Sequence, residues 1–141
     1  MKTPQISTSA LAIFSSALLS LCLPALAFNP ASVPRHQKNA PEQLKIEVTQ
    51  IKEEKVVRDG IESLCIHVEA KVARVTKSDT GLKGGEVIQI YYEIPQSDAA
   101  IGGGWPGKIQ KGSYDAYLLF DKKDGKRYLP AAYTGTFVPA K

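Results

Sequence analysis

Apolar and polar residues alternate most regularly in residues 63–77, which read SLCIHVEAKVARVTK. One face of this stretch is aliphatic throughout, whereas the other face is mainly polar. The aliphatic positions are Leu64, Ile66, Val68, Ala70 and Val72. A period of two predicts a half-buried antiparallel strand. We expect the rest of the domain to cover its apolar face.

The same criterion predicts four further strands, at residues 44–55, 86–95, 113–121 and 127–138. Pro130 and Gly135 interrupt the last of them, so we expect it to be an edge or a bulged closing strand. The only helical turn that we expect lies at residues 97–101. The predicted fold class is therefore all-β, a small five-stranded antiparallel barrel.

The dipeptide Asp59-Gly60 joins the first two predicted strands and is the strongest turn signal in the chain. Asp-Gly readily adopts the positive φ angles of a two-residue type I′ turn. Such a turn places Arg58 opposite Ile61, and this pair sets the register of the whole hairpin.

The register of the hairpin pairs Ile51 with Val68, and both side chains then lie on the apolar face. Continued without interruption, the same register would set Val48 opposite a lysine. One extra residue at positions 49–50 restores the pairing of Val48 with Ala70. We therefore predict a β-bulge there, which bends the first strand sharply.

The N-terminal segment has the features of a secretory signal peptide. Lys2 precedes an apolar run at residues 11–23, and a small-x-small motif ends at Ala27. We predict that residues 1–27 are removed by cleavage after Ala27. The apolar run is shorter than the about 20 residues of a membrane-spanning helix, so we expect no span in the mature protein. A lipoprotein signal ending at Cys22 is the alternative interpretation.

Residues 28–43 contain three prolines and no apolar period, which predicts an extended, flexible spacer before a folded domain at residues 44–138. Export places the protein in the periplasm or outside the cell. Cleavage would leave Cys65 as the single cysteine, so no internal disulfide can form. Removal of Lys2 would leave 17 basic and 14 acidic residues, a net charge of +3. Charges of both signs alternate along the chain, which argues against a nucleic-acid surface.

Two loops form the predicted binding face. The loop at residues 78–85 carries Leu82 as its one apolar side chain, which we expect to plug the barrel. The loop at residues 96–112 surrounds Trp105 with glycines. Because glycines offer no side-chain cover, Trp105 either folds back as a lid on the barrel or stays exposed as a platform for a partner. The predicted binding residues are Trp105, Leu82, Ile101 and Tyr114.

Short motifs along the predicted strands resemble a known fold family. Residues 68–75 read VEAKVARV, residues 81–84 read GLKG and residues 87–90 read VIQI, and residues 111–118 lead from a glycine into a strand. This order resembles the netrin-module and metalloproteinase-inhibitor branch of the OB-fold. The resemblance implies an OB-like barrel that binds other macromolecules through its loops. The disulfides and N-terminal cysteine of that family have no counterpart here, where the mature chain would begin at Phe28.

Cys65 and His67 lie two residues apart on one predicted strand, so their side chains point to the same face and could share a soft metal ion. The other histidine, His36, lies in the predicted spacer. Two ligands do not complete a tetrahedral zinc site. A small-ligand or metal-handling protein that uses Cys65 and His67 is therefore the alternative function.

The chain offers no recognisable catalytic constellation in its sequence. Its two histidines suggest no Ser-His-Asp arrangement, and no Lys-Ser/Thr follows the glycine run as in a phosphate loop. We expect neither a catalytic residue nor a cofactor. The leading hypothesis is an exported, monomeric, non-catalytic binding module that engages a protein of the cell envelope through its barrel loops.

Overall fold

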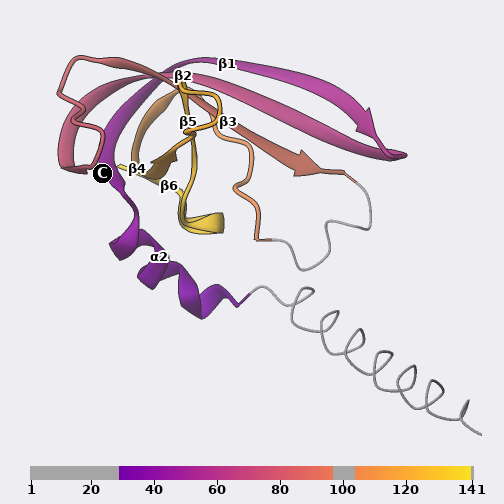
Figure 1. Cartoon of the computed structure of the whole chain (residues 1–141), viewed down its shortest axis with the longest axis horizontal. Helices are drawn as coiled ribbons and strands as arrows, with labels where there is room; N and C mark the ends of the chain where they lie inside the picture. The colour runs from indigo at the N-terminus through magenta and orange to yellow at the C-terminus, as the bar shows by residue number, and fades with distance from the viewer. Residues whose placement is uncertain (1–28, 97–103, 141) are drawn as a thin grey trace, which may run out of the picture. The chain divides into compact units, whose positions relative to one another are not determined.

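The computed structural model describes residues 29–96 and 104–140 (Figure 1). The predicted signal peptide and Ile101 lie outside the described residues. The fold is all-β, with short helical segments near both ends of the described chain. Its elements are η1 (Pro30–Ser32), α2 (Val33–Asn39), β1 (Glu42–Arg58), β2 (Ile61–Ser78), β3 (Val87–Pro95), β4 (Gly112–Phe120), β5 (Arg127–Pro130), η3 (Tyr133–Gly135) and β6 (Phe137–Pro139).

Five of the six strands form a ring. The strands follow the order β1-β2-β3-β5-β4-β6, and β1 also pairs with β4, so that β6 extends the sheet beyond the ring. β3 and β5 run parallel, whereas every other pairing is antiparallel. The prediction of a purely antiparallel sheet is therefore wrong at this one contact. The parallel contact arises because β5 lies between β3 and β4 in the sheet: it runs antiparallel to β4 and therefore parallel to β3.

The predicted fifth strand at residues 127–138 is two strands separated by a turn. β5 ends at Pro130, which has no amide hydrogen to continue a ladder. The chain then turns through η3, where Tyr133 has a φ of 50°. The Thr136 hydroxyl donates to the Tyr133 carbonyl at 2.9 Å and accepts from the Ala132 amide at 3.1 Å. These bonds hold the turn that leads into β6.

The hairpin of β1 and β2 is the longest feature of the fold and arches across the other strands (Figure 1). Its turn confirms the prediction, because Asp59 and Gly60 have φ angles of 54° and 78°. Arg58 pairs with Ile61 as predicted.

The predicted bulge in β1 is confirmed. Ile51 pairs with Val68 and Val48 pairs with Ala70, so that Thr49 is the extra residue. β1 pairs with β4 only between Glu42 and Val48. The bulge therefore lies where β1 leaves the ring. Two further register shifts leave Ala73 and Thr76 of β2 without a partner residue on β1. These shifts were not predicted.

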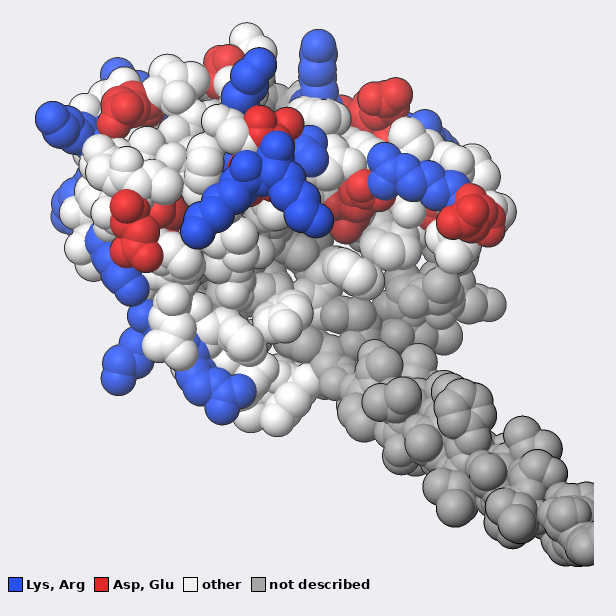
Figure 2. Space-filling model, viewed as in Figure 1, with Lys and Arg blue, Asp and Glu red and all other residues white. Residues whose placement is uncertain are grey.

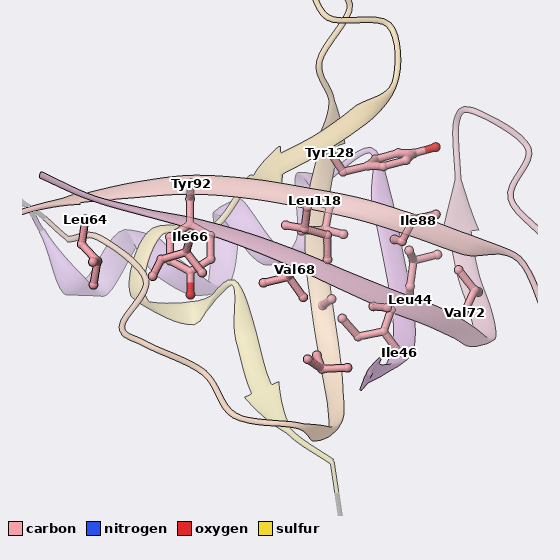
Figure 3. Packing of buried hydrophobic residues seen from close by; sticks show 14 residues of the cluster. Leu44, Ile46, Leu64, Ile66, Val68, Val72, Ile88, Tyr92, Leu118 and Tyr128 are labelled. Atoms are coloured by element: carbon pink, nitrogen blue, oxygen red, sulfur yellow. The ribbon is translucent and has the colours of Figure 1, made fainter. Parts of the chain in front are cut away.

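The core lies between the inner faces of the ring strands (Figure 3). Ile46, Val68 and Leu118 are fully buried there. Leu82 packs against this cluster and is partly buried, which confirms the expected plug. The buried cluster consists of Leu44, Ile46, Val48, Leu64, Ile66, Val68, Ala70, Val72, Ile88, Ile90, Tyr92, Ala116, Leu118 and Tyr128.

The extended spacer predicted before the domain is wrong for residues 30–39, which form η1 and α2. Asn29 caps η1 by accepting a hydrogen bond from the Ala31 amide at 3.0 Å. The Gln37 side chain donates to the Gly135 carbonyl at 2.9 Å. The His36 ring meets the Tyr133 ring edge to face, with centroids 4.9 Å apart. α2 is thus packed on η3, and β1 begins at Glu42, two residues earlier than predicted.

Candidate binding cleft

A cleft opens where the pairing of β3 and β5 ends. The parallel ladder joins Gln89 to Arg127 and Ile90 to Tyr128, and goes no further. β3 continues to Pro95 beside β2, whereas β5 stops at Pro130. The end of β3 therefore has a neighbouring strand on one side only.

The cleft has a volume of about 460 Å³ and a mostly apolar lining. Its walls come from α2, β3, the segment after residue 103, the end of β4, β5 and η3. The lining residues are His36, Tyr91, Tyr92, Glu93, Gly104, Trp105, Pro106, Leu119, Leu129, Pro130, Ala131 and Tyr133. Such a concave, aromatic surface with a few polar groups is typical of a ligand or peptide site.

Trp105 remains 45% exposed, so it is not the buried lid that was one of the two expectations. Tyr133, which also lines the cleft, is exposed to the same extent. Tyr92 positions the segment that carries Trp105, since its hydroxyl donates to the Gly107 carbonyl at 2.8 Å. Burial raises the pKa of Tyr92, so its hydroxyl keeps its proton for this bond. Pro106, the residue after Trp105, is buried. The Tyr92 hydrogen bond therefore anchors to β3 the backbone two residues after Trp105.

A polar network borders the cleft on the outer face of the sheet. Arg58 Nη1 and the Tyr91 hydroxyl both donate to Glu93 Oε2, each at 2.5 Å. These two donors, Tyr91 first, hold the pKa of Glu93 below its usual range. The Arg127 guanidinium stacks over the Tyr91 ring, 4.2 Å from its centroid. Desolvation is the main reason that the pKa of Tyr91 is raised. Glu93 is therefore an anion at neutral pH, held in one position.

The cleft does not contain all the predicted binding residues. Trp105 lines it, but Leu82 and Tyr114 do not. Tyr114 accepts a hydrogen bond from the Gln110 amide at 3.1 Å and lines a separate cavity of about 280 Å³. Ile101 lies outside the described residues. Of the predicted binding residues that the structure describes, this cleft therefore contains only Trp105.

Sequence reasoning missed most of the cleft walls. The sequence places His36 in an extended spacer and Tyr133 in an edge or bulged closing strand. Both reach the cleft through the packing of α2 on η3. The one available signal was Pro130, because a proline inside a predicted strand marks the place where its ladder must stop.

The outer face of β2 carries the two predicted metal ligands. Cys65 is buried, with its Sγ 3.4 Å from the Tyr91 hydroxyl. His67 is exposed, and its ring lies 4.8 Å from the Tyr91 ring. Within residues 29–96 and 104–140, no three histidine, cysteine or carboxylate side chains are grouped as metal ligands. The pair thus gains no third protein ligand from the described residues.

Comparisons with protein-family models, with curated proteins and with solved structures returned no match. None of the helices in the described residues is long and apolar enough to cross a membrane.

Proposed function

We propose that this protein is a non-catalytic binding module that holds a segment of a protein partner in the cleft beside Trp105. The observation that carries the proposal is the half-exposed Trp105 side chain at the wall of an apolar cleft of about 460 Å³. Tryptophan is among the residue types that most often dominate the free energy of protein–protein binding. A non-catalytic role fits Glu93, whose lowered pKa makes it a poor proton donor at neutral pH.

We further propose that the domain is an OB-like fold exported to the cell envelope. The bent first hairpin and the five-strand ring closed by β1 and β4 support the fold assignment. The apolar run and the small-x-small motif before Phe28 support export. The similarity of residues 68–90 to the netrin-module and metalloproteinase-inhibitor branch supports a macromolecular ligand. The partner is accordingly a protein of the periplasm or envelope.

Affinity capture from the native envelope fraction tests the proposal. The purified protein is compared with its Trp105→Ala variant and with Val57→Ala, a control that truncates an apolar side chain 68% exposed near the hairpin turn. We expect the wild type and the control to retain the same protein and Trp105→Ala to lose it.

Binding to the captured protein is then measured directly with purified components. Removal of a central tryptophan costs about 2 kcal/mol or more, so Kd should rise by about 30-fold in Trp105→Ala. Equal affinities of Trp105→Ala and Val57→Ala would contradict the proposal.

A further inference from the structure

We propose that the partner binds as an added β-strand: an extended peptide pairs with the free edge of β3 at residues 91–93 and places a large apolar side chain against Trp105. This inference rests on the proposed function and specifies its binding mode. It also commits to the chemistry of the partner, a peptide with an apolar residue flanked by basic or neutral residues.

The direction of the main-chain groups on β3 supports this mode. Gln96 donates to the Glu62 carbonyl at 2.8 Å. Hydrogen-bonded and non-hydrogen-bonded pairs alternate in an antiparallel ladder, so the even-numbered residues of β3 bond to β2. The N–H and C=O groups of Tyr91 and Glu93 therefore point away from β2, toward the cleft side of the strand.

Pro130 explains why these groups lack a strand partner. In the parallel register of Ile90 with Tyr128, the amide of Tyr128 faces the carbonyl of Gln89. The next amide of β5 that would face β3, opposite the Tyr91 carbonyl, is that of residue 130. Proline has no amide hydrogen, so the ladder stops. The Tyr91 carbonyl and both main-chain groups of Glu93 are left for a strand from outside, since no strand of the described residues pairs there.

A second free strand edge, on β1, carries charges that the free edge of β3 lacks. Beyond the bulge, β1 pairs with β2 alone, and its open edge carries the run Lys52-Glu53-Glu54-Lys55. Charges on an edge strand oppose pairing with another chain. The open end of β3 reads Tyr91-Tyr92-Glu93-Ile94-Pro95, with a single charge. The chain thus protects the β1 edge from added strands and leaves the β3 edge open to them.

Charge complementarity defines the side chains of the partner. Among the described residues that line the cleft there is one carboxylate, Glu93, and neither lysine nor arginine. Arg58 and Tyr91 both bond to Oε2 of this carboxylate, so Oε1 retains its capacity to accept a hydrogen bond. A basic residue of the partner beside the apolar anchor can donate a hydrogen bond to this oxygen, whereas an ionised acidic residue has no proton to donate to it.

The test uses heptapeptides of defined sequence and the isotope-labelled protein. The probes are Thr-Thr-Lys-X-Lys-Thr-Thr, blocked at both ends, with tyrosine, tryptophan, phenylalanine or leucine at X. We expect amide chemical-shift changes at residues 91–93 and at the Trp105 indole. Kd should rise by about tenfold when the two lysines are replaced by glutamate. Trp105→Ala should abolish these shifts.

Backbone N-methylation of the probe tests whether it binds by main-chain pairing with β3. Methylation of every second amide, those facing β3, should raise Kd by about tenfold or more, whereas methylation of the intervening amides should leave it unchanged. Pro130→Val, which restores an amide of similar apolar character, should let β5 pair further along β3 and weaken the probe by a similar factor.

Binding that requires Trp105 but is indifferent to N-methylation would overturn strand addition while leaving the proposed binding module intact. Failure of every probe to bind would also overturn it, because main-chain pairing needs no particular sequence. The capture experiment with Trp105→Ala decides the binding function separately.

Discussion

Glu42 is a fully buried carboxylate at the start of β1. Its Oε1 accepts hydrogen bonds from the Ser78 and Thr80 hydroxyls. Its Oε2 accepts from the backbone amides of Asp79 and Thr80 at 3.1 and 3.2 Å. Thr80 also bonds to the Tyr128 hydroxyl at 2.9 Å. One side chain thus joins β1 to the loop after β2 and to β5, at the end of the ring where these elements meet.

We expect Glu42→Ala to lower the free energy of unfolding by about 2–4 kcal/mol, because it leaves two amides and two hydroxyls without their acceptor in a buried site. Glu42→Gln is the matched control. Its carbonyl can still accept from the amides, and the hydroxyls can turn to accept from its NH₂ group, so the loss should be about 1 kcal/mol. Urea denaturation monitored by circular dichroism measures both. Equal losses in the two variants would show that the hydrogen bonds do not determine the effect.

At the scale of elements, α2 depends on a glycine almost a hundred residues away in the chain. A Cβ atom on Gly135 would overlap Val33 Cγ1 and lie 2.8 Å from Gln37 Nε2. The absence of a side chain at Gly135 is therefore what allows α2 to pack on η3. An isolated helix of seven residues is not stable in water, so this contact is necessary for α2 to form.

Gly135→Ala should displace α2, speed hydrogen exchange of its amides and lower the free energy of unfolding by about 1–3 kcal/mol. Gly107→Ala is the control, because a Cβ there meets nothing within 4 Å. Hydrogen exchange followed by mass spectrometry reports on the helix directly. Unchanged exchange in α2 of Gly135→Ala would contradict the role assigned to this glycine.

At the scale of the whole molecule, the edge of β1 beyond the bulge pairs with β2 alone and must be kept from pairing with other copies. The hairpin edge of β1 is charged, and Glu53 there is also paired with Lys108 at 3.1 Å. Figure 2 shows acidic and basic residues interspersed over the visible face rather than separated into patches. Interspersed charges of this kind oppose self-association, so we expect the protein to be a monomer.

Removing the charges from the β1 edge should cause association. We expect the quadruple variant K52T/E53V/E54T/K55V to form dimers and larger species as its concentration rises, whereas the wild type sediments as a single monomeric species. Sedimentation velocity over a range of concentrations distinguishes the two. A variant that remains monomeric would show that the edge is protected by its geometry and not by its charge.

The β1–β2 hairpin was predictable because its determinants are local. Asp59-Gly60 sets the turn, and the mismatch between Val48 and Ile51 reveals the bulge at Thr49, since both residues must face the core. The shifts at Ala73 and Thr76 have no such signal, because the apolar pattern of β2 weakens there. Trp105 was identified as a candidate from its glycine-rich surroundings, but the choice between lid and platform depends on contacts with distant residues.

Local sequence by itself determined the all-β class, the Asp59-Gly60 turn and the bulge, because strand period and turn chemistry act over a few neighbouring residues. The tertiary structure decided the parallel contact of β3 with β5, the packing of α2 on η3 and hence the cleft. Each of these brings together residues that are about 40 to 100 positions apart in the chain. Such contacts depend on which surfaces remain uncovered once the ring has closed, and no periodicity along the chain records that.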